Sequence, residues 1–125
     1  MTSLAVNVTR DMLINANDRP AHWGIRHRKA QLLRGLGWAA ARGAQVTPHI
    51  RCTLVVTITY PPLARRRDAS NLAPTIKHLL DGCIDGGILP DDDDKRIVAT
   101  TYQASGERGE TGVWRFQLEF TEAAA

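Results

Sequence analysis

The sequence predicts a small α+β domain in which two main helices pack against a mixed β-sheet of about four strands. Three observations lead to this class. The chain has 125 residues, which is enough for one hydrophobic core and therefore for a single domain over residues 1–125. Ile50–Tyr60 alternates like a half-buried strand, and Leu72–Gly86 carries apolar residues at helical spacing.

The chain up to Gly43 is expected to contribute one strand and the longer helix. Leu4–Ile14 alternates weakly and predicts a short strand that runs into a polar loop. Ala21–Arg42 is rich in alanine, leucine and arginine, lacks proline and has apolar residues at helical spacing. Gly35 and Gly37 weaken this helix, and Gly43 is a candidate for its end because glycine readily adopts the left-handed conformation.

The chain from Ile50 onward predicts three strands and a second helix. β-branched residues dominate Ile50–Tyr60, and two prolines end that strand. The helix over Leu72–Gly86 accepts Pro74 in its first turn, where amide hydrogens have no intrahelical partner. Two more strands are expected over Arg96–Gln103 and Val113–Phe120. The inward side chains of the last strand are Trp114, Phe116, Leu118 and Phe120.

Composition excludes several classes of protein. No run of about 18 apolar residues is present, so no membrane span is expected, and the N-terminus does not resemble a secretion signal. Cys52 and Cys83 are too few for a disulfide framework or a cysteine metal site, which favours a reducing cytoplasm. The four histidines show no ligand spacing and are expected at the surface.

Charge is divided between two segments, although the net charge is only +3. From Arg19 to Arg67 there are ten Lys or Arg and no acid, whereas Asp68 to Asp94 contains seven Asp and the single Lys77. A basic segment neutralises phosphates, and a carboxylate cluster holds cations, so the pattern suits a nuclease. A solvated charged surface on any small domain would show the same pattern.

The acidic segment holds the candidate chemistry. Asp68 precedes the second helix, Lys77 and Asp81 share one stripe of that helix, and Asp91–Asp94 follow its end. Two or three carboxylates suffice for Mg²⁺, which activates water and stabilises charge on a phosphate. The competing interpretations are a helix cap at Asp68 and a solvated turn at Asp91–Asp94.

Distance along the helix limits how these acids combine. A helix over Leu72–Gly86 is about 20 Å long. Asp68 and Asp91 therefore lie near opposite ends, and the short connection after the helix returns only part of the way. A shared metal site needs either Asp81 as an intermediate ligand or the facing end of a partner subunit.

The same segment resembles the RusA family of Holliday junction resolvases, small homodimeric endonucleases encoded largely by phages and prophages. The form RRDxxNLxPTxKxxxDGxxDxGxLPDDD is similar to the variant common among phages of actinobacteria. The resemblance covers nearly the whole chain and is most specific from Arg65 to Asp93. The matching residues are Arg66-Arg67-Asp68-Ala69-Ser70-Asn71-Leu72, Lys77, Asp81, Gly86-Gly87 and Leu89-Pro90-Asp91-Asp92.

This resemblance implies paired, symmetric, Mg²⁺-dependent cleavage of four-way DNA junctions by a homodimer, with Mn²⁺ as a substitute ion. It implies roles in DNA recombination, replication and repair in the cytoplasm of a bacterial host, with no small-molecule cofactor and no membrane. Asp68 and Asp92 correspond to essential acids, and Lys77 to an assisting lysine. The second acid of the family's first motif is Ser70 here, so Asp81 or Asp91 is expected to replace that ligand.

The DNA-binding residues are expected around these motifs and in the loop before the first helix. Two alternatives to an enzyme remain open. One is a junction-binding protein with weak or lost cleavage, which the serine at position 70 favours. The other is a structural phage protein that keeps only the fold. The predicted DNA contacts are Arg65, Arg66, Arg67, Asn71, Lys77, Asn17 and Arg19.

Overall fold

The computed structural model describes residues 1–16, 23–44, 48–65, 69–90 and 96–123. It confirms a small α+β domain with a four-stranded mixed sheet and two helices. Two 3-10 turns, η1 and η2, precede the two helices. The elements in chain order are β1 (Thr2–Thr9), η1 (Arg10–Met12), α1 (Trp23–Gly43), β2 (Cys52–Tyr60), η2 (Ala69–Leu72), α2 (Ala73–Asp85), β3 (Ile97–Arg108) and β4 (Val113–Glu122).

The sheet has the strand order β1-β4-β2-β3. β4 pairs antiparallel with both β1 and β2, whereas β2 and β3 are parallel. Leu118 of β4 lies opposite Leu4 on one side and Val56 on the other, so the apolar rows of three strands align. A parallel pair needs a crossover connection, and α2 lies within the connection between β2 and β3.

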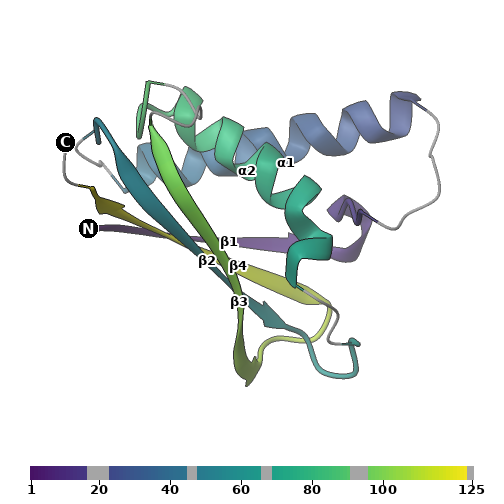
Figure 1. Cartoon of the computed structure of the whole chain (residues 1–125). Coiled ribbons are helices and arrows are strands. Elements are labelled where there is room, and N and C mark those ends of the chain that lie inside the picture. Colours follow the sequence, from purple (N-terminus) through teal and green to yellow (C-terminus); the bar gives the residue numbers. More distant parts are fainter. Residues whose placement is uncertain (17–22, 45–47, 66–68, 91–95, 124–125) are drawn as a thin grey trace.

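Both helices lie on one face of the sheet, as Figure 1 shows. The alternating residues of β1, β2 and β4 that face the helices are buried, and their neighbours are half-buried or exposed. Each of these strands therefore contributes one row to a single core. The largest fully buried apolar side chains are Phe116, Phe120, Leu33, Leu54, Ile58, Ile76, Leu79, Ile88 and Leu118.

Two glycines allow the backbones of α1 and α2 to touch. A Cβ atom on Gly37 of α1 would overlap the carbonyl oxygen of Leu79, and one on Gly82 of α2 would overlap that of Arg34. These obstacles are backbone atoms, which cannot move aside as a flexible side chain can. Gly37 therefore weakens α1 locally but is required where the two helices meet. By contrast, a Cβ on Gly35 would meet nothing within 4 Å.

β3 forms one edge of the sheet among the described residues, and no helix covers it. All its residues from Val98 to Arg108 are exposed, on both faces. On the face away from the helices, Gln103 donates a 2.9 Å hydrogen bond to Thr57 of β2. β3 is thus paired with β2 along one edge, and its other edge has no partner strand among the described residues.

His49 was expected at the surface, and that prediction is wrong. Only 9% of the residue is exposed. Its Nε2 lies 2.9 Å from the hydroxyl of Thr2, and its Nδ1 hydrogen-bonds to the carboxylate of Glu122. That bond is the main cause that holds the pKa of Glu122 below its ordinary value. The imidazole therefore has a structural role, joining β1 and β4 at one end of the sheet.

Both cysteines are buried free thiols. Burial raises the pKa of Cys83 to about 12 and also raises the pKa of Cys52. Both side chains stay protonated at neutral pH, which argues against a role as nucleophiles. Within the described part of the chain, no helix is both long enough and apolar enough to cross a membrane.

Candidate functional site

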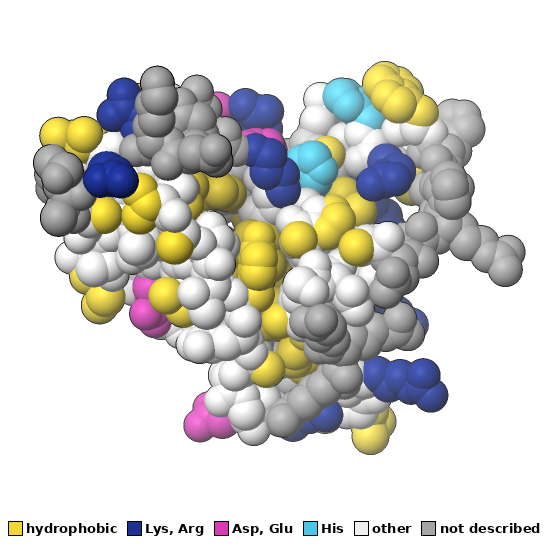
Figure 2. Space-filling model, viewed as in Figure 1, with side chains coloured by type: hydrophobic (Ala, Val, Ile, Leu, Met, Phe, Trp, Pro, Cys, Tyr) yellow, Lys and Arg dark blue, Asp and Glu magenta, His cyan; other side chains and the backbone are white. Residues whose placement is uncertain are grey.

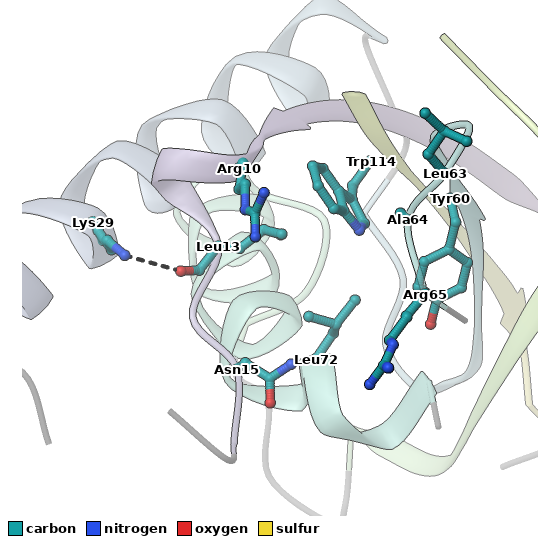
Figure 3. A pocket seen from close by; sticks show the side chains of 10 residues that line it. All are labelled: Arg10, Leu13, Asn15, Lys29, Tyr60, Leu63, Ala64, Arg65, Leu72 and Trp114. Carbon is teal, nitrogen blue, oxygen red and sulfur yellow. Dashed lines mark hydrogen bonds between the residues drawn. The ribbon is translucent and has the colours of Figure 1, made fainter. Parts of the chain in front are cut away.

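A cavity of about 500 Å³ opens where the end of β2 meets η1, α1 and the first turn of the crossover. Three basic side chains line it: Arg10 from η1, Lys29 from α1 and Arg65 from the loop after β2. Figure 3 shows the indole of Trp114 and the side chain of Leu72 directed into this space between Arg10 and Arg65. The other lining residues are Leu13, Asn15, Tyr60, Leu63 and Ala64, so none of the described lining residues is acidic.

Hydrogen bonds fix the segment between η1 and α1 at one wall of the cavity. The hydroxyl of Thr75, fully buried on α2, accepts a 2.8 Å bond from the amide of Ile14 and donates another of 2.8 Å to its carbonyl. The amide of Ala16 also donates to the carbonyl of Asn71, at 2.7 Å. The predicted DNA residue Asn71 is half-buried and thus also holds this wall through its backbone.

The opposite wall is the loop after β2, which is attached to the end of β3. Arg108 donates from Nη1 to the carbonyl oxygens of Pro61 and Ala64, at 3.1 and 2.7 Å. Leu63, between these two anchors, has a left-handed backbone with φ of 67° and a fully exposed side chain. A leucine in this conformation is strained, and such strain is typical of loops held for function.

The charges at the cavity suit an anion. Arg10 and Arg65 are exposed, whereas Lys29 is half-buried and donates a 3.2 Å bond to the carbonyl of Leu13. A guanidinium group has a planar set of donors that matches phosphate oxygens, and the ammonium group adds a point charge. The cavity can therefore bind a phosphate group beside an aromatic wall. It offers no described carboxylate for a metal ion.

The stripe predicted on the second helix is present on α2. Lys77 donates a 3.0 Å bond to the carboxylate of Asp81, whose side chain is 24% exposed. Asp85, one turn further on, instead accepts two bonds from Arg34 of α1, one of them 2.9 Å long. The hydrogen bond from Arg34 holds the pKa of Asp85 below its ordinary value, and the same contact raises the pKa of Arg34.

Asp81 alone does not make a metal site. Among the described residues no group of three His, Cys, Asp or Glu could hold a metal ion. To bind a cation, the Asp81 carboxylate must also share or give up its contact with Lys77. Several residues predicted for the site lie outside the described residues: Asp68, Asp91, Asp92, Arg66, Arg67, Asn17 and Arg19.

The described residues on either side of the two acidic motifs lie at opposite ends of β2. Arg65 precedes the first motif and lines the cavity with Tyr60, the last residue of β2. Arg96 follows the second motif, and its carbonyl accepts a 2.8 Å bond from the amide of Cys52, the first residue of β2. A nine-residue strand spans about 26 Å. This separation is consistent with the expectation from the sequence that the length of the second helix keeps the two acidic motifs of one chain apart.

The sequence predicts a DNA contact at Arg65, but it does not mark Arg10, Lys29 or Trp114, which line the same cavity. Arg10 and Lys29 are far apart in the chain and meet only because η1 turns toward α1, so no local motif marks them. Trp114 was expected as a core residue of the last strand. It is half-buried and faces the cavity, because it lies near the start of β4.

No protein-family model matches the chain, and no curated protein matches it either.

Proposed function

We propose that this protein is a Mg²⁺-dependent endodeoxyribonuclease that resolves four-way or other branched DNA junctions by paired symmetric nicks. The observation that carries the proposal is the basic cavity, with no acid among its described lining residues, that ends at Arg65, directly before the Arg66-Arg67-Asp68 motif in the sequence. The cavity supplies a place for a phosphate group, and the motif supplies the first acid of the resemblance to RusA resolvases. Such an enzyme acts as a homodimer in the cytoplasm of a bacterial host of the encoding phage.

The residues divide into three roles in this proposal. Arg10 and Arg65 bind backbone phosphates and orient the strand, since phosphate contacts position a protein on DNA. Asp68 and Asp92, with Asp81 or Asp91, provide the oxygen donors that Mg²⁺ prefers. When bound, the ion would supply activation of water and neutralisation of charge on the scissile phosphate. Lys77 holds Asp81 in place and offers its ammonium group to the DNA.

A synthetic four-way junction tests the proposal. The purified protein is expected to place symmetric paired nicks in the presence of Mg²⁺. Asp92→Asn is expected to reduce cleavage about a thousandfold or more while binding persists, because a metal ligand stabilises the reacting phosphate by several kcal/mol. Junction binding is measured by gel shift, and nicking on each labelled strand.

The alternative function is a junction-binding protein without efficient cleavage, and Ser70 favours it. Ser70 is exposed at the start of the crossover and supplies no negative charge for a metal ion. Junction binding without nicks in either Mg²⁺ or Mn²⁺ would support this alternative. Equal affinity for a junction and for a linear duplex would contradict both functions.

Removal of a basic side chain from the cavity is expected to lower the affinity for DNA. Arg65→Ala is expected to weaken junction binding and to reduce the slope of log affinity against log salt by about 1, because one phosphate contact is lost. Arg115→Ala is a matched control, since Arg115 is exposed on β4 and does not line the cavity. The measurement is a salt titration of binding for both variants. Equal slopes for the two variants would contradict a role for the cavity in DNA binding.

A further inference from the structure

The cavity at the end of β2 has an aromatic wall as well as basic side chains. The indole of Trp114 is half-buried, and Figure 3 shows it directed into the space between Arg10 and Arg65. Its N–H group donates no hydrogen bond to any described residue. A tryptophan away from water usually has a partner for this donor. The wall therefore offers an aromatic surface and an unused donor to a ligand.

The guanidinium groups on either side of the indole are available to an anion. Arg10 and Arg65 are exposed, and neither makes an ion pair with a described residue. Lys29 adds a third positive charge to the lining of the same cavity. Figure 2 shows Lys and Arg side chains gathered at the lower right, where the loop after β2 lies in Figure 1. A phosphate group attracted by these charges would lie next to the indole.

The size and the chemistry of the cavity together suit a nucleotide. Its volume of about 500 Å³ is within the range of sites that hold small molecules. A nucleotide joins a flat base to a phosphate through a single sugar, so the two groups stay close to each other. Inorganic phosphate would leave the aromatic wall unused, and an apolar ligand would leave the arginines without an anion.

We infer that the cavity binds one unpaired nucleotide of a DNA strand, with the base stacked on Trp114 and the two flanking phosphates bound by Arg10 and Arg65. A base within a duplex is stacked between its neighbours and cannot reach an indole in a recessed wall, whereas an unpaired base can. The arginines lie on different sides of the indole in Figure 3. They therefore suit a nucleotide within a strand, which has a phosphate on each side, better than a free nucleoside monophosphate, which has one.

The walls of this cavity are held in place without a ligand. Arg108 fixes the loop after β2 through the carbonyl oxygens of Pro61 and Ala64. On the other side, Lys29 donates a hydrogen bond to the carbonyl of Leu13. A binding site whose walls are already ordered loses less conformational freedom when the ligand binds.

The inference rests on the proposed function for its substrate, and it names the feature of branched DNA that the cavity recognises. Moving a base out of a stack costs least where the base is already unpaired. A branch point interrupts the stacking of neighbouring base pairs, so it supplies such bases more readily than a linear duplex does. The cavity would thereby help the protein to select branched DNA over linear DNA.

Two short single strands separate the contribution of the base from that of the phosphates. One is pentathymidylate, and the other is an abasic strand with the same number of phosphates. The wild type is expected to bind pentathymidylate about 5- to 150-fold more tightly, which is the effect of stacking one base on an aromatic side chain. Trp114→Leu is expected to remove this difference and to leave the affinity for the abasic strand unchanged. Trp38→Leu is the matched control and should keep the difference, since Trp38 is exposed on α1 and does not line the cavity.

Tryptophan fluorescence measures the stacking directly. The chain has three tryptophans, so replacing Trp23 and Trp38 with phenylalanine leaves Trp114 as the single indole. Pentathymidylate is expected to quench its emission, whereas the abasic strand and inorganic phosphate are not. This measurement keeps Trp114 in place, so it tests the inference even if circular dichroism shows that Trp114→Leu does not fold.

Equal affinity of the wild type for the two strands, or unquenched emission of Trp114 with pentathymidylate, would overturn the inference. Thymidine 5′-monophosphate that binds as tightly as pentathymidylate would overturn the assignment to a DNA strand. Binding to single strands does not depend on cleavage. A protein that shows the base preference but never nicks a junction would therefore contradict the proposed function alone. A protein that nicks junctions but binds both strands equally would contradict this inference alone.

Discussion

Mixing Asp68→Asn subunits with Asp92→Asn subunits is expected to restore DNA cleavage that neither variant has by itself. If the two acids of one metal site come from different chains, a mixed dimer contains one site with both changes and one site with none. Random exchange makes half of the dimers mixed, so about a quarter of the wild-type number of sites should return. The restored product is a single nick, because each mixed dimer has only one working site.

The experiment is a nicking assay on a junction with each strand labelled, after unfolding and refolding the two variants together. Chains with tags of different length allow the mixed dimers to be separated and counted. Differently tagged copies of one variant, mixed in the same way, are the control and should remain inactive. Mixed dimers that form in quantity but do not nick would assign both acids to the same chain.

Gly82→Ala is expected to lower the free energy of unfolding by about 1–3 kcal/mol or more, because an overpacked contact must be relieved. The added methyl group would overlap the carbonyl oxygen of Arg34 in α1, so relief requires the two helices to separate. Gly35→Ala gives the opposite result. Its Cβ is free of contacts, and alanine is favoured over glycine in a helix by about 1 kcal/mol.

Urea unfolding of both variants, followed by circular dichroism, measures the difference. Comparison of Gly35→Ala with Gly82→Ala separates the effect of glycine on helix propensity from its effect on helix packing. Both positions are helical, and only Gly82 faces the other helix. Equal stabilisation by alanine at both positions would show that α1 and α2 do not approach each other at Gly82.

The fold class could be predicted because the patterns of the individual elements are strong. The alternation of Ile50–Tyr60 and the apolar stripe of Leu72–Gly86 correspond to β2 and α2 within two residues at each end. β1 was predicted too long, because Arg10–Met12 forms a 3-10 turn in place of strand. Conversely, β3 continues five residues beyond Gln103, into a segment that reads as a turn from its glycines and charges.

The candidate site could be predicted only in part, because its two acidic motifs are local and its cavity is not. Helical spacing alone predicts that Lys77 and Asp81 share one stripe of the second helix, and α2 confirms this, since Lys77 donates a hydrogen bond to Asp81 there. Arg10, Lys29 and Trp114 reach the cavity from three separate elements, so their proximity depends on tertiary packing that no spacing rule contains. The order of the strands in the sheet likewise could not be predicted from the sequence, and neither could the position of Arg96 relative to Tyr60.

β4 lies in the interior of the sheet although it is the last strand along the chain. During synthesis on a ribosome, β1 and β2 cannot be joined until Val113–Glu122 has emerged, since β4 is the strand that pairs with both. Until then the nascent chain exposes the apolar rows of both strands, which favours association with chaperones. Pairing across such long sequence separations also slows folding. Loss of β4 by proteolysis would leave β1 with no partner strand in the described sheet.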